Sequence, residues 1–214
     1  SWKDNLRIAW FGCFLTGASI SLVVPFMPIF VEQLGIEGDQ VAFYSGLAIS
    51  VSAISAAVVS PIWGILADKY GRKPMMIRAG LAMTITMGGL AFVPNVFWLL
   101  FLRFLNGVFT GFVPNATALI ASQVPKDRSG YALGTLSTGV VAGTLTGPFV
   151  GGFIAEIFGI RNVFLLVGSF LFLAAILTIL FIKENFQPVP KEKALPTKEL
   201  FTSVKYPFLL INLF

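Results

Sequence analysis

Charged residues at the ends of long apolar segments are the groups in this sequence that could do chemistry. Asp68 and Arg72 lie on either side of the turn-forming Gly71. An acid at a helix C-terminus is disfavoured by the helix dipole, so Asp68 needs a partner, either Arg72 or the N-terminus of another helix. Lys73 follows directly, and a second short loop supplies Asp127 as another acid for Arg72. These groups predict an ion-pair latch that can form and break.

A second kind of candidate is an ionisable group that could carry or control a proton. Arg103 lies inside an apolar segment, roughly 10 Å from its nearer end by the helical rise. A buried ion there marks a functional site, with snorkelling toward the interface as the alternative. A coupling carboxylate needs a pKa that burial can raise toward neutrality. No acid lies at the centre of a predicted helix, so either Glu32 or Glu156 serves, or the main proton site lies outside this chain.

Other chemistry has few suitable residues. The chain has no histidine and one cysteine, Cys13, which is best read as a small packing residue. No cluster of metal ligands and no nucleophile paired with a base is present in the sequence. We therefore expect no metal site and no enzyme activity.

The composition indicates that lipid is the main solvent of this chain. Apolar residues make up 56% of its 214 residues and charged residues 12%, and the mean hydropathy is +0.85. A bilayer core needs about 20 apolar residues of helix, and alternating strands of about 10 residues are not seen. The class is therefore an all-α membrane protein. We expect spanning helices near residues 7–31, 42–67, 74–94, 96–120, 131–157 and 160–183.

The basic residues set the orientation. With the N-terminus in the cytoplasm, thirteen of the fifteen lysines and arginines fall on the cytoplasmic side, as the positive-inside rule requires. The net charge of +5 then needs no nucleic-acid partner. We expect a six-helix domain over 1–183, a cytoplasmic linker over 184–206, and the start of a truncated seventh helix over 207–214, so that the chain is a fragment of a longer protein.

Two helix ends repeat one pattern. The segments 64–71 and 152–159 both read glycine, two apolar residues, alanine, an acid, any residue, an aromatic residue and glycine. The two helices cross in opposite directions, which is the pattern of an inverted three-plus-three repeat and favours alternating access. Chance similarity between glycine-rich helices is the alternative.

The fifth segment carries a stripe of glycines at a spacing of four residues, with a proline inside it. Such a stripe lets another helix approach closely, and the proline favours a bend. Structural packing and a gating hinge explain the stripe equally well. The hinge candidates are Gly143, Gly147, Pro148, Gly151 and Gly152.

A cavity for hydrophobic compounds needs apolar walls and few fixed polar groups. For an aromatic residue or methionine, core packing or lipid contact is the simpler explanation, whereas asparagine is poorly tolerated by lipid. The candidates are Phe26, Met27, Tyr44, Asn106, Phe109, Phe112 and Asn115.

Together these motifs resemble the major facilitator superfamily, over the whole chain as its N-terminal half. Residues 64–73 resemble the signature between helices two and three, and 100–107 resemble the fourth-helix motif, with Asn106 in place of the frequent glutamine. Residues 143–152 are similar to the fifth-helix motif of proton-coupled drug exporters. Residues 25–28 resemble a first-helix motif of the twelve-helix drug antiporters, although Ser19 replaces a usual glycine.

The resemblance, which is greatest to multidrug efflux proteins of Gram-positive bacteria, implies export of lipophilic, often cationic drugs in exchange for protons. It implies a place in the cell membrane, a six-helix C-terminal half as partner, and no cofactor beyond the proton gradient. It makes Asp68, Arg72 and Asp127 an inner-gate charge relay, and gives Arg103 a part in proton coupling. The alternatives are an importer of a small solute and a half-length, self-pairing membrane module without transport.

Overall fold

A computed structural model describes residues 1–186, and every regular element in this range is helical. Six helical spans are long and apolar enough to cross a bilayer, and they coincide with the six expected segments. The all-α prediction is therefore confirmed. Most of the expected linker and the expected seventh segment, 207–214, lie outside the described residues.

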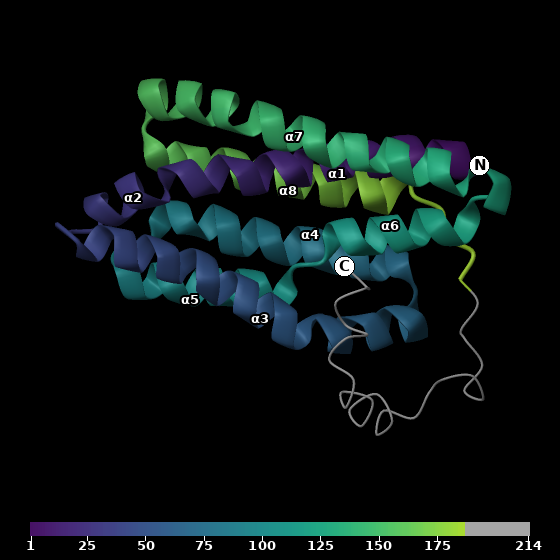
Figure 1. Cartoon of the computed structure of the whole chain (residues 1–214), viewed down its shortest axis with the longest axis horizontal. Coiled ribbons are helices and arrows are strands. Elements are labelled where there is room, and N and C mark those ends of the chain that lie inside the picture. The colour runs from purple at the N-terminus through teal and green to yellow at the C-terminus, as the bar shows by residue number, and fades with distance from the viewer. Residues whose placement is uncertain (187–214) are drawn as a thin grey trace.

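Consecutive spans run in opposite directions (Figure 1). The first three spans consist of α1 (Trp2–Val23), the 3₁₀ turn η1 (Val24–Phe26) and α2 (Met27–Gln33); of α3 (Gln40–Tyr70); and of α4 (Arg72–Gly89) with η2 (Leu90–Phe92). The last three consist of α5 (Val96–Phe109) and α6 (Phe112–Gln123); of η3 (Lys126–Arg128) and α7 (Ser129–Phe158); and of α8 (Ile160–Phe181).

The fourth span is broken in the middle, which the sequence pattern did not predict. Thr110 is extended, and Gly111 has a φ of 130°, so α5 and α6 are separate helices. A broken helix in lipid exposes carbonyl groups that must find donors. The indole of Trp63 donates to the Val108 oxygen at 2.6 Å, and the Asn115 amide donates to the Gly111 oxygen at 2.7 Å. Side chains thus satisfy the backbone that the break leaves open.

The helix packing has the symmetry of an inverted repeat. The most extensive contacts join α1 to α7, α4 to α8 and α3 to α5. In an inverted repeat, spans one, two and three correspond to spans four, five and six. The contact of the first span with the fifth (α1–α7) then corresponds to the contact of the fourth span with the second (α5–α3). The contact between the third and sixth spans (α4–α8) corresponds to itself. In Figure 1, α1 lies against α7, and α3 lies beside α5. The fold therefore agrees with the repeat that the matched helix ends predicted.

The two matched helix ends also have the same backbone geometry. Gly71 follows α3 with φ 101° and ψ 161°, and Gly159 follows α7 with φ 84° and ψ 163°. Residues with a side chain rarely adopt such positive φ values, so both positions favour glycine. Each glycine N–H donates to the alanine four residues before it, Ala67 at 2.9 Å and Ala155 at 3.0 Å.

The glycine stripe of α7 faces α1 and forms their close contact. A Cβ atom at Gly147 would lie 2.7 Å from the carbonyl oxygen of Ala18, and one at Gly143 would overlap the carbonyl oxygen of Phe14. Gly152 is different, because nothing lies within 4 Å of its Cβ position. Pro148 lies inside α7, which continues past it as one helix. Four glycines of the stripe are buried in this contact: Gly139, Gly143, Gly147 and Gly151.

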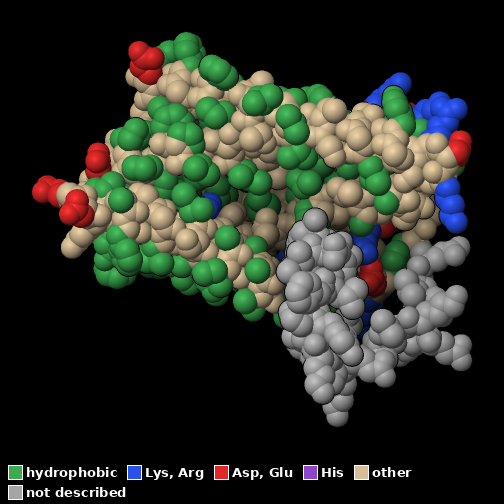
Figure 2. Space-filling view, viewed as in Figure 1, with side chains coloured by type: hydrophobic (Ala, Val, Ile, Leu, Met, Phe, Trp, Pro, Cys, Tyr) green, Lys and Arg blue, Asp and Glu red, His purple; other side chains and the backbone are tan. Residues whose placement is uncertain are grey.

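Charged side chains gather at the two ends of the bundle, with a largely uncharged surface between them (Figure 2). We call the end that carries the N-terminus and the α3–α4 turn the basic end, and the opposite end the acidic end. The basic end includes Lys3, Arg7, Lys69, Arg72, Lys73, Lys126, Arg128 and Lys183. The acidic end includes Glu32, Glu37, Asp39 and Glu156.

We predict that Gly143→Ala destabilises the full-length protein, because the added methyl group forces α1 and α7 apart. Overpacking of this kind costs about 1–3 kcal/mol. Gly134→Ala is the matched control, since it is the same change in the same helix and no atom lies within 4 Å of a Cβ atom built at Gly134. The measurement is the melting temperature of the purified protein in detergent. Equal melting temperatures for the two variants would contradict the close α1–α7 contact.

Candidate functional site

The turn between α3 and α4 brings Asp68 and Arg72 into contact. The Arg72 guanidinium donates to the Asp68 carboxylate in an ion pair across Gly71. The Asp68 side chain is 56% exposed, so one side of its carboxylate remains free for a further partner. Of the two partners expected for Asp68, the structure contains Arg72. Gly64, one helical turn earlier on α3, has no atom within 4 Å of its Cβ position.

Asp127 does not form the expected ion pair with Arg72 within the described residues. It lies in η3, at the same end of the bundle, and its own ion pair is with Arg128 at 3.9 Å. Both of these side chains are largely exposed. The described residues therefore contain the Asp68–Arg72 part of the expected relay and not the contact to Asp127.

Lys73 anchors the same turn to the last turn of α8. Its ammonium donates to the carbonyl oxygens of Ile179 at 3.0 Å and Ile182 at 2.6 Å. Cations are favoured at helix C-termini, where carbonyl groups lack partners within the helix. Lys73 therefore joins the third span to the sixth.

Glu184 holds the turn from the other side, and sequence reasoning missed it. Its two carboxylate oxygens accept the backbone N–H groups of Arg72 and Lys73, each at 2.8 Å. A carboxylate at a helix N-terminus satisfies free donors and suits the helix dipole. The available signal was that α4 is preceded by Gly71, which has no side chain to cap the helix. The sequence could not tell which of the acids would supply one.

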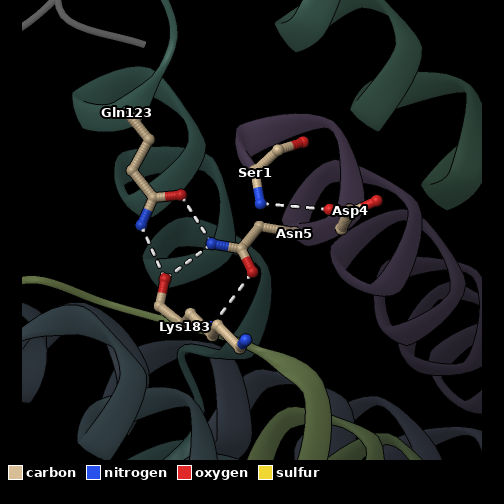
Figure 3. Close-up of polar contacts among 5 residues, drawn as sticks. All are labelled: Ser1, Asp4, Asn5, Gln123 and Lys183. Atoms are coloured by element: carbon tan, nitrogen blue, oxygen red, sulfur yellow. Dashed lines mark hydrogen bonds and ion pairs between the residues drawn. The ribbon is translucent and has the colours of Figure 1, made fainter.

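A partly buried amide network fixes the chain just before Glu184 (Figure 3). The Asn5 amide donates to the Gln123 side chain at 2.7 Å and to the Lys183 carbonyl oxygen at 2.6 Å. The Asn5 side-chain oxygen accepts from the Lys183 N–H at 3.0 Å, and Gln123 donates to the same Lys183 carbonyl oxygen at 3.0 Å. The first, fourth and sixth spans are thus joined at the basic end, directly beside the ion-pair turn.

A cavity of about 230 Å³ lies in the middle of the bundle, between α1, α3, α4 and α5. Its walls are mostly apolar, and its polar lining comes from a few groups. These are Ser19, Ser52, Arg103, Asn106 and Thr110. Of the residues predicted for substrate binding, Asn106 alone lines this cavity, and the predicted coupling residue Arg103 lies beside it.

Arg103 is buried, with 8% of its surface exposed. Its Nε donates to the Ala48 carbonyl oxygen at 3.1 Å, and its Nη1 contacts the Met87 sulfur at 3.5 Å. No carboxylate within residues 1–186 makes an ion pair with it. A buried guanidinium with these neutral neighbours can still bind an anionic group that enters the cavity.

Asn106 lies one helical turn from Arg103 and ties three helices together. Its amide donates to the Ser52 hydroxyl at 3.4 Å, and its oxygen accepts from the Thr86 hydroxyl at 3.2 Å. Ser55 donates to the Phe104 carbonyl oxygen at 3.1 Å. These contacts hold α3 and α4 against α5 around the cavity.

The other predicted binding residues do not line the cavity. Phe112 and Met27 are fully buried core residues, and Asn115 bonds to Gly111 at the break of the fourth span. Phe109 packs against Trp63, with ring centroids 6.2 Å apart. Partly buried side chains of Phe26 and Tyr44 pack on the core cluster toward the acidic end.

The two acids proposed for proton coupling lie at the acidic end. Glu32 lies near the end of α2, and Glu156 lies near the end of α7. Both side chains are exposed, and neither forms an ion pair within the described residues.

Arg78 is one of the thirteen basic residues that the positive-inside rule assigns to the cytoplasmic side, and the structure places it half-buried against the bundle. The Arg78 guanidinium stacks on Trp63, with its Cζ 3.5 Å from the ring centroid. Its Nη2 donates to the Thr110 carbonyl oxygen at 3.2 Å. The Nε and Nη1 atoms are buried and have no hydrogen-bond partner in the described part of the chain. Arg78 therefore supports the break in the fourth span.

Comparison with known proteins gives a consistent result. The Major Facilitator Superfamily model matches residues 9–214. The chain is 87% identical over 214 residues to the multi-drug resistance efflux pump PmrA of Streptococcus pneumoniae serotype 4, covering 100% of this chain and 54% of that protein. It is 50% identical to the multidrug resistance protein MdtG of Proteus mirabilis, covering 100% of this chain and 54% of the relative. The chain thus spans about half the length of these relatives.

A solved structure has the same fold. The crystal structure of the human organic anion transporter MFSD10 (TETRAN) matches with a TM-score of 0.77 over 93% of this chain and 52% of that chain. The sequence identity is 16%, so this match bears on the fold alone.

We predict that Glu184→Ala lowers the melting temperature of the full-length protein by a few degrees. The change leaves two N–H groups of α4 without their carboxylate, and the loss of such a cap costs about 0.5–2 kcal/mol. Glu32→Ala is the matched control, since it removes an equal charge from an exposed residue. A melting temperature unchanged by Glu184→Ala would show that the carboxylate does not hold this turn.

Proposed function

The chain belongs to the major facilitator superfamily, and we propose that, together with a six-helix companion half, it exports lipophilic, often cationic compounds in exchange for protons. Family membership confirms the predicted resemblance and the prediction that the chain is a transporter rather than an enzyme. The observation that carries the proposal is the 87% identity, over the whole chain, to a relative named as a multidrug efflux pump.

The exposed faces of α3 and α7 support a companion half. These two helices are the least covered of the six spans. Large apolar side chains stand exposed along them: Ile54, Val58 and Ile62 on α3, and Leu145, Phe149 and Phe153 on α7. The relatives are about twice as long as this chain, so a second bundle of similar size can cover these faces.

The size of the central cavity also supports a site shared by two halves. Ligand sites usually measure about 300–1,000 Å³. The cavity of about 230 Å³ is smaller, and it opens toward the surface of the bundle. We infer that it is one wall of a larger binding site. The apolar walls suit lipophilic compounds. Because the cavity has only a few fixed polar groups, it places little restriction on which of these compounds binds.

For coupling, we propose that Arg103 responds to the charge of a carboxylate in the shared cavity. A deprotonated carboxylate is attracted to the buried guanidinium, whereas a protonated one is not. Proton binding would then change the contacts around Arg103. The carboxylate comes from the companion half, or is Glu32 or Glu156 reached from the acidic end.

For gating, we propose that the exposed Asp68 carboxylate binds the companion half and closes the basic end. Lys73, Glu184 and the Asn5 network hold this turn in place, so movement of the turn is transmitted to the first, fourth and sixth spans. The positive-inside rule places the basic end in the cytoplasm. When the basic end is closed, the cavity is open to the outside of the bacterial cell.

We predict that cells expressing the full-length protein accumulate less ethidium than cells without it, and that collapse of the pH gradient removes this difference. The reason is that export against a concentration gradient needs the energy of proton entry. The measurement is ethidium fluorescence with and without a protonophore. Accumulation that does not respond to collapse of the gradient contradicts proton coupling.

We predict that Asp68→Asn strongly reduces ethidium export without preventing insertion into the membrane. The substitution removes the charge that pairs with Arg72 and binds the companion half. Asp39→Asn is the control, because Asp39 is also an exposed acid but makes no side-chain cap bond at the start of α3. Both variants are compared at equal amounts of membrane protein. Full export by Asp68→Asn contradicts the latch.

A further inference from the structure

We propose that the α7–α8 turn at the acidic end is a second latch, in which Glu156 binds a cationic group of the companion half and closes that end. The inference rests on the proposed transport function. It changes the role of Glu156 from a proton carrier to a gate residue, and it gives Arg161 a positioning role.

The two turns share their backbone and their acid. Asp68 and Glu156 each lie three residues before a glycine with positive φ, and each carboxylate follows the alanine whose oxygen accepts that glycine's N–H. Both acids are exposed. The same eight-residue pattern therefore places an acid in the same position at opposite ends of the bundle.

The two turns are also anchored in the same way. Lys73 lies two residues after Gly71 and donates to carbonyl oxygens at the C-terminal end of the sixth span. Arg161 lies two residues after Gly159. Its Nη1 donates to carbonyl oxygens at the C-terminal end of the third span, Ala91 at 2.7 Å and Val93 at 3.2 Å. Lys73 thus joins the third span to the sixth, and Arg161 joins the sixth span to the third. These two spans correspond to each other in the inverted repeat.

The anchor at Arg161 reaches the core. Its guanidinium lies 5.7 Å from the ring centroid of Phe30, which is fully buried and packs on Phe164 at 4.6 Å. Arg161 therefore joins the end of the first span to the third and sixth spans. These contacts couple a movement of the α7–α8 turn to the three spans.

Each acid lies next to an open glycine. Gly64 and Gly152 precede Asp68 and Glu156 by one helical turn, so each glycine and acid share one helix face. No atom lies within 4 Å of a Cβ atom built at either glycine, whereas the four buried glycines of α7 all meet α1. An open glycine lets a second helix approach closely beside the acid. The open face of α7 is therefore suited to a helix of the companion half.

The two turns differ in one respect that identifies the missing partner. Arg72 follows Gly71 and pairs with Asp68, but the residue after Gly159 is the buried, apolar Ile160. Glu156 has no ion-pair partner among residues 1–186. A carboxylate on a face otherwise suited to helix packing needs a cation when that face is covered. The companion half must therefore bring one.

The two latches act on opposite states. When the acidic end closes, Glu156 gains its partner and Asp68 loses the companion half, and the reverse holds when the basic end closes. Removing one charge therefore shifts the population toward the state that the other charge stabilises. Glu156→Gln and Asp68→Asn should have effects of opposite sign.

The test measures access to the cavity from the acidic side in the full-length protein. In a background in which Cys13 and any cysteines of the companion half are replaced by alanine, Ile49→Cys places a single thiol at the cavity wall contributed by α3. Labelling by a membrane-impermeant maleimide reports opening of the acidic end. We expect Glu156→Gln to raise the labelling rate about fivefold, the shift that about 1 kcal/mol produces in a two-state equilibrium. Asp68→Asn should lower it, and the double variant should lie between the two.

Three further variants separate a latch from a general loss of structure. Arg161→Gln should raise the labelling rate as Glu156→Gln does, and Arg161→Lys should restore part of the wild-type rate. Glu37→Gln, the loss of an exposed charge at the same end, should leave the rate unchanged. The proposal is overturned if Glu156→Gln leaves the rate unchanged or lowers it. Labelling requires no transport, so this result is independent of the ethidium assay.

Discussion

Backbone groups at helix ends and breaks must find hydrogen bonds in a chain that lies mostly in lipid, and the arrangement of this bundle follows from that requirement. The carbonyl oxygens that end the third and sixth spans accept from Arg161 and Lys73. The N–H groups that begin α4 donate to Glu184. Most charged groups that order the turns are therefore bonded to backbone, and this fixes which helices move together.

Exchange symmetry gives these contacts a consequence for mechanism. A bundle made of two copies of one unit in opposite orientations can close at either end by equivalent contacts. The α1–α7 contact and its counterpart between the fourth span and α3 are both close helix crossings. In the first, the α7 glycines meet the α1 backbone, and in the second, Gly107 meets Ser52 and Ser55. Each crossing joins one three-span unit to the other, so the crossings hold the two units together in one bundle.

The central cavity combines one buried charge with neutral surroundings. The hydrogen-bond partners of Arg103 are a carbonyl oxygen and a sulfur atom, both neutral. They therefore compete only weakly with an anionic group that enters the cavity and binds the guanidinium. The Asn106 network keeps the three surrounding helices in register. A site of this kind responds to charge more than to shape, which suits the proposed export of varied compounds in exchange for protons.

The sequence by itself determined the six spans, the all-α class and the matched turns, and it limited the partner of Asp68 to Arg72 or a helix N-terminus, because apolar length, glycine at a positive φ and a four-residue spacing are local properties. The tertiary structure decided that the glycine stripe meets α1, that Asp127 stays apart from Arg72, and that the fourth span breaks at Gly111. It also assigned Glu184 to the start of α4 and Lys73 to the end of α8, partners that lie 112 and 109 residues apart. Such pairs depend on which helices become neighbours, and a single sequence carries no local signal for that choice.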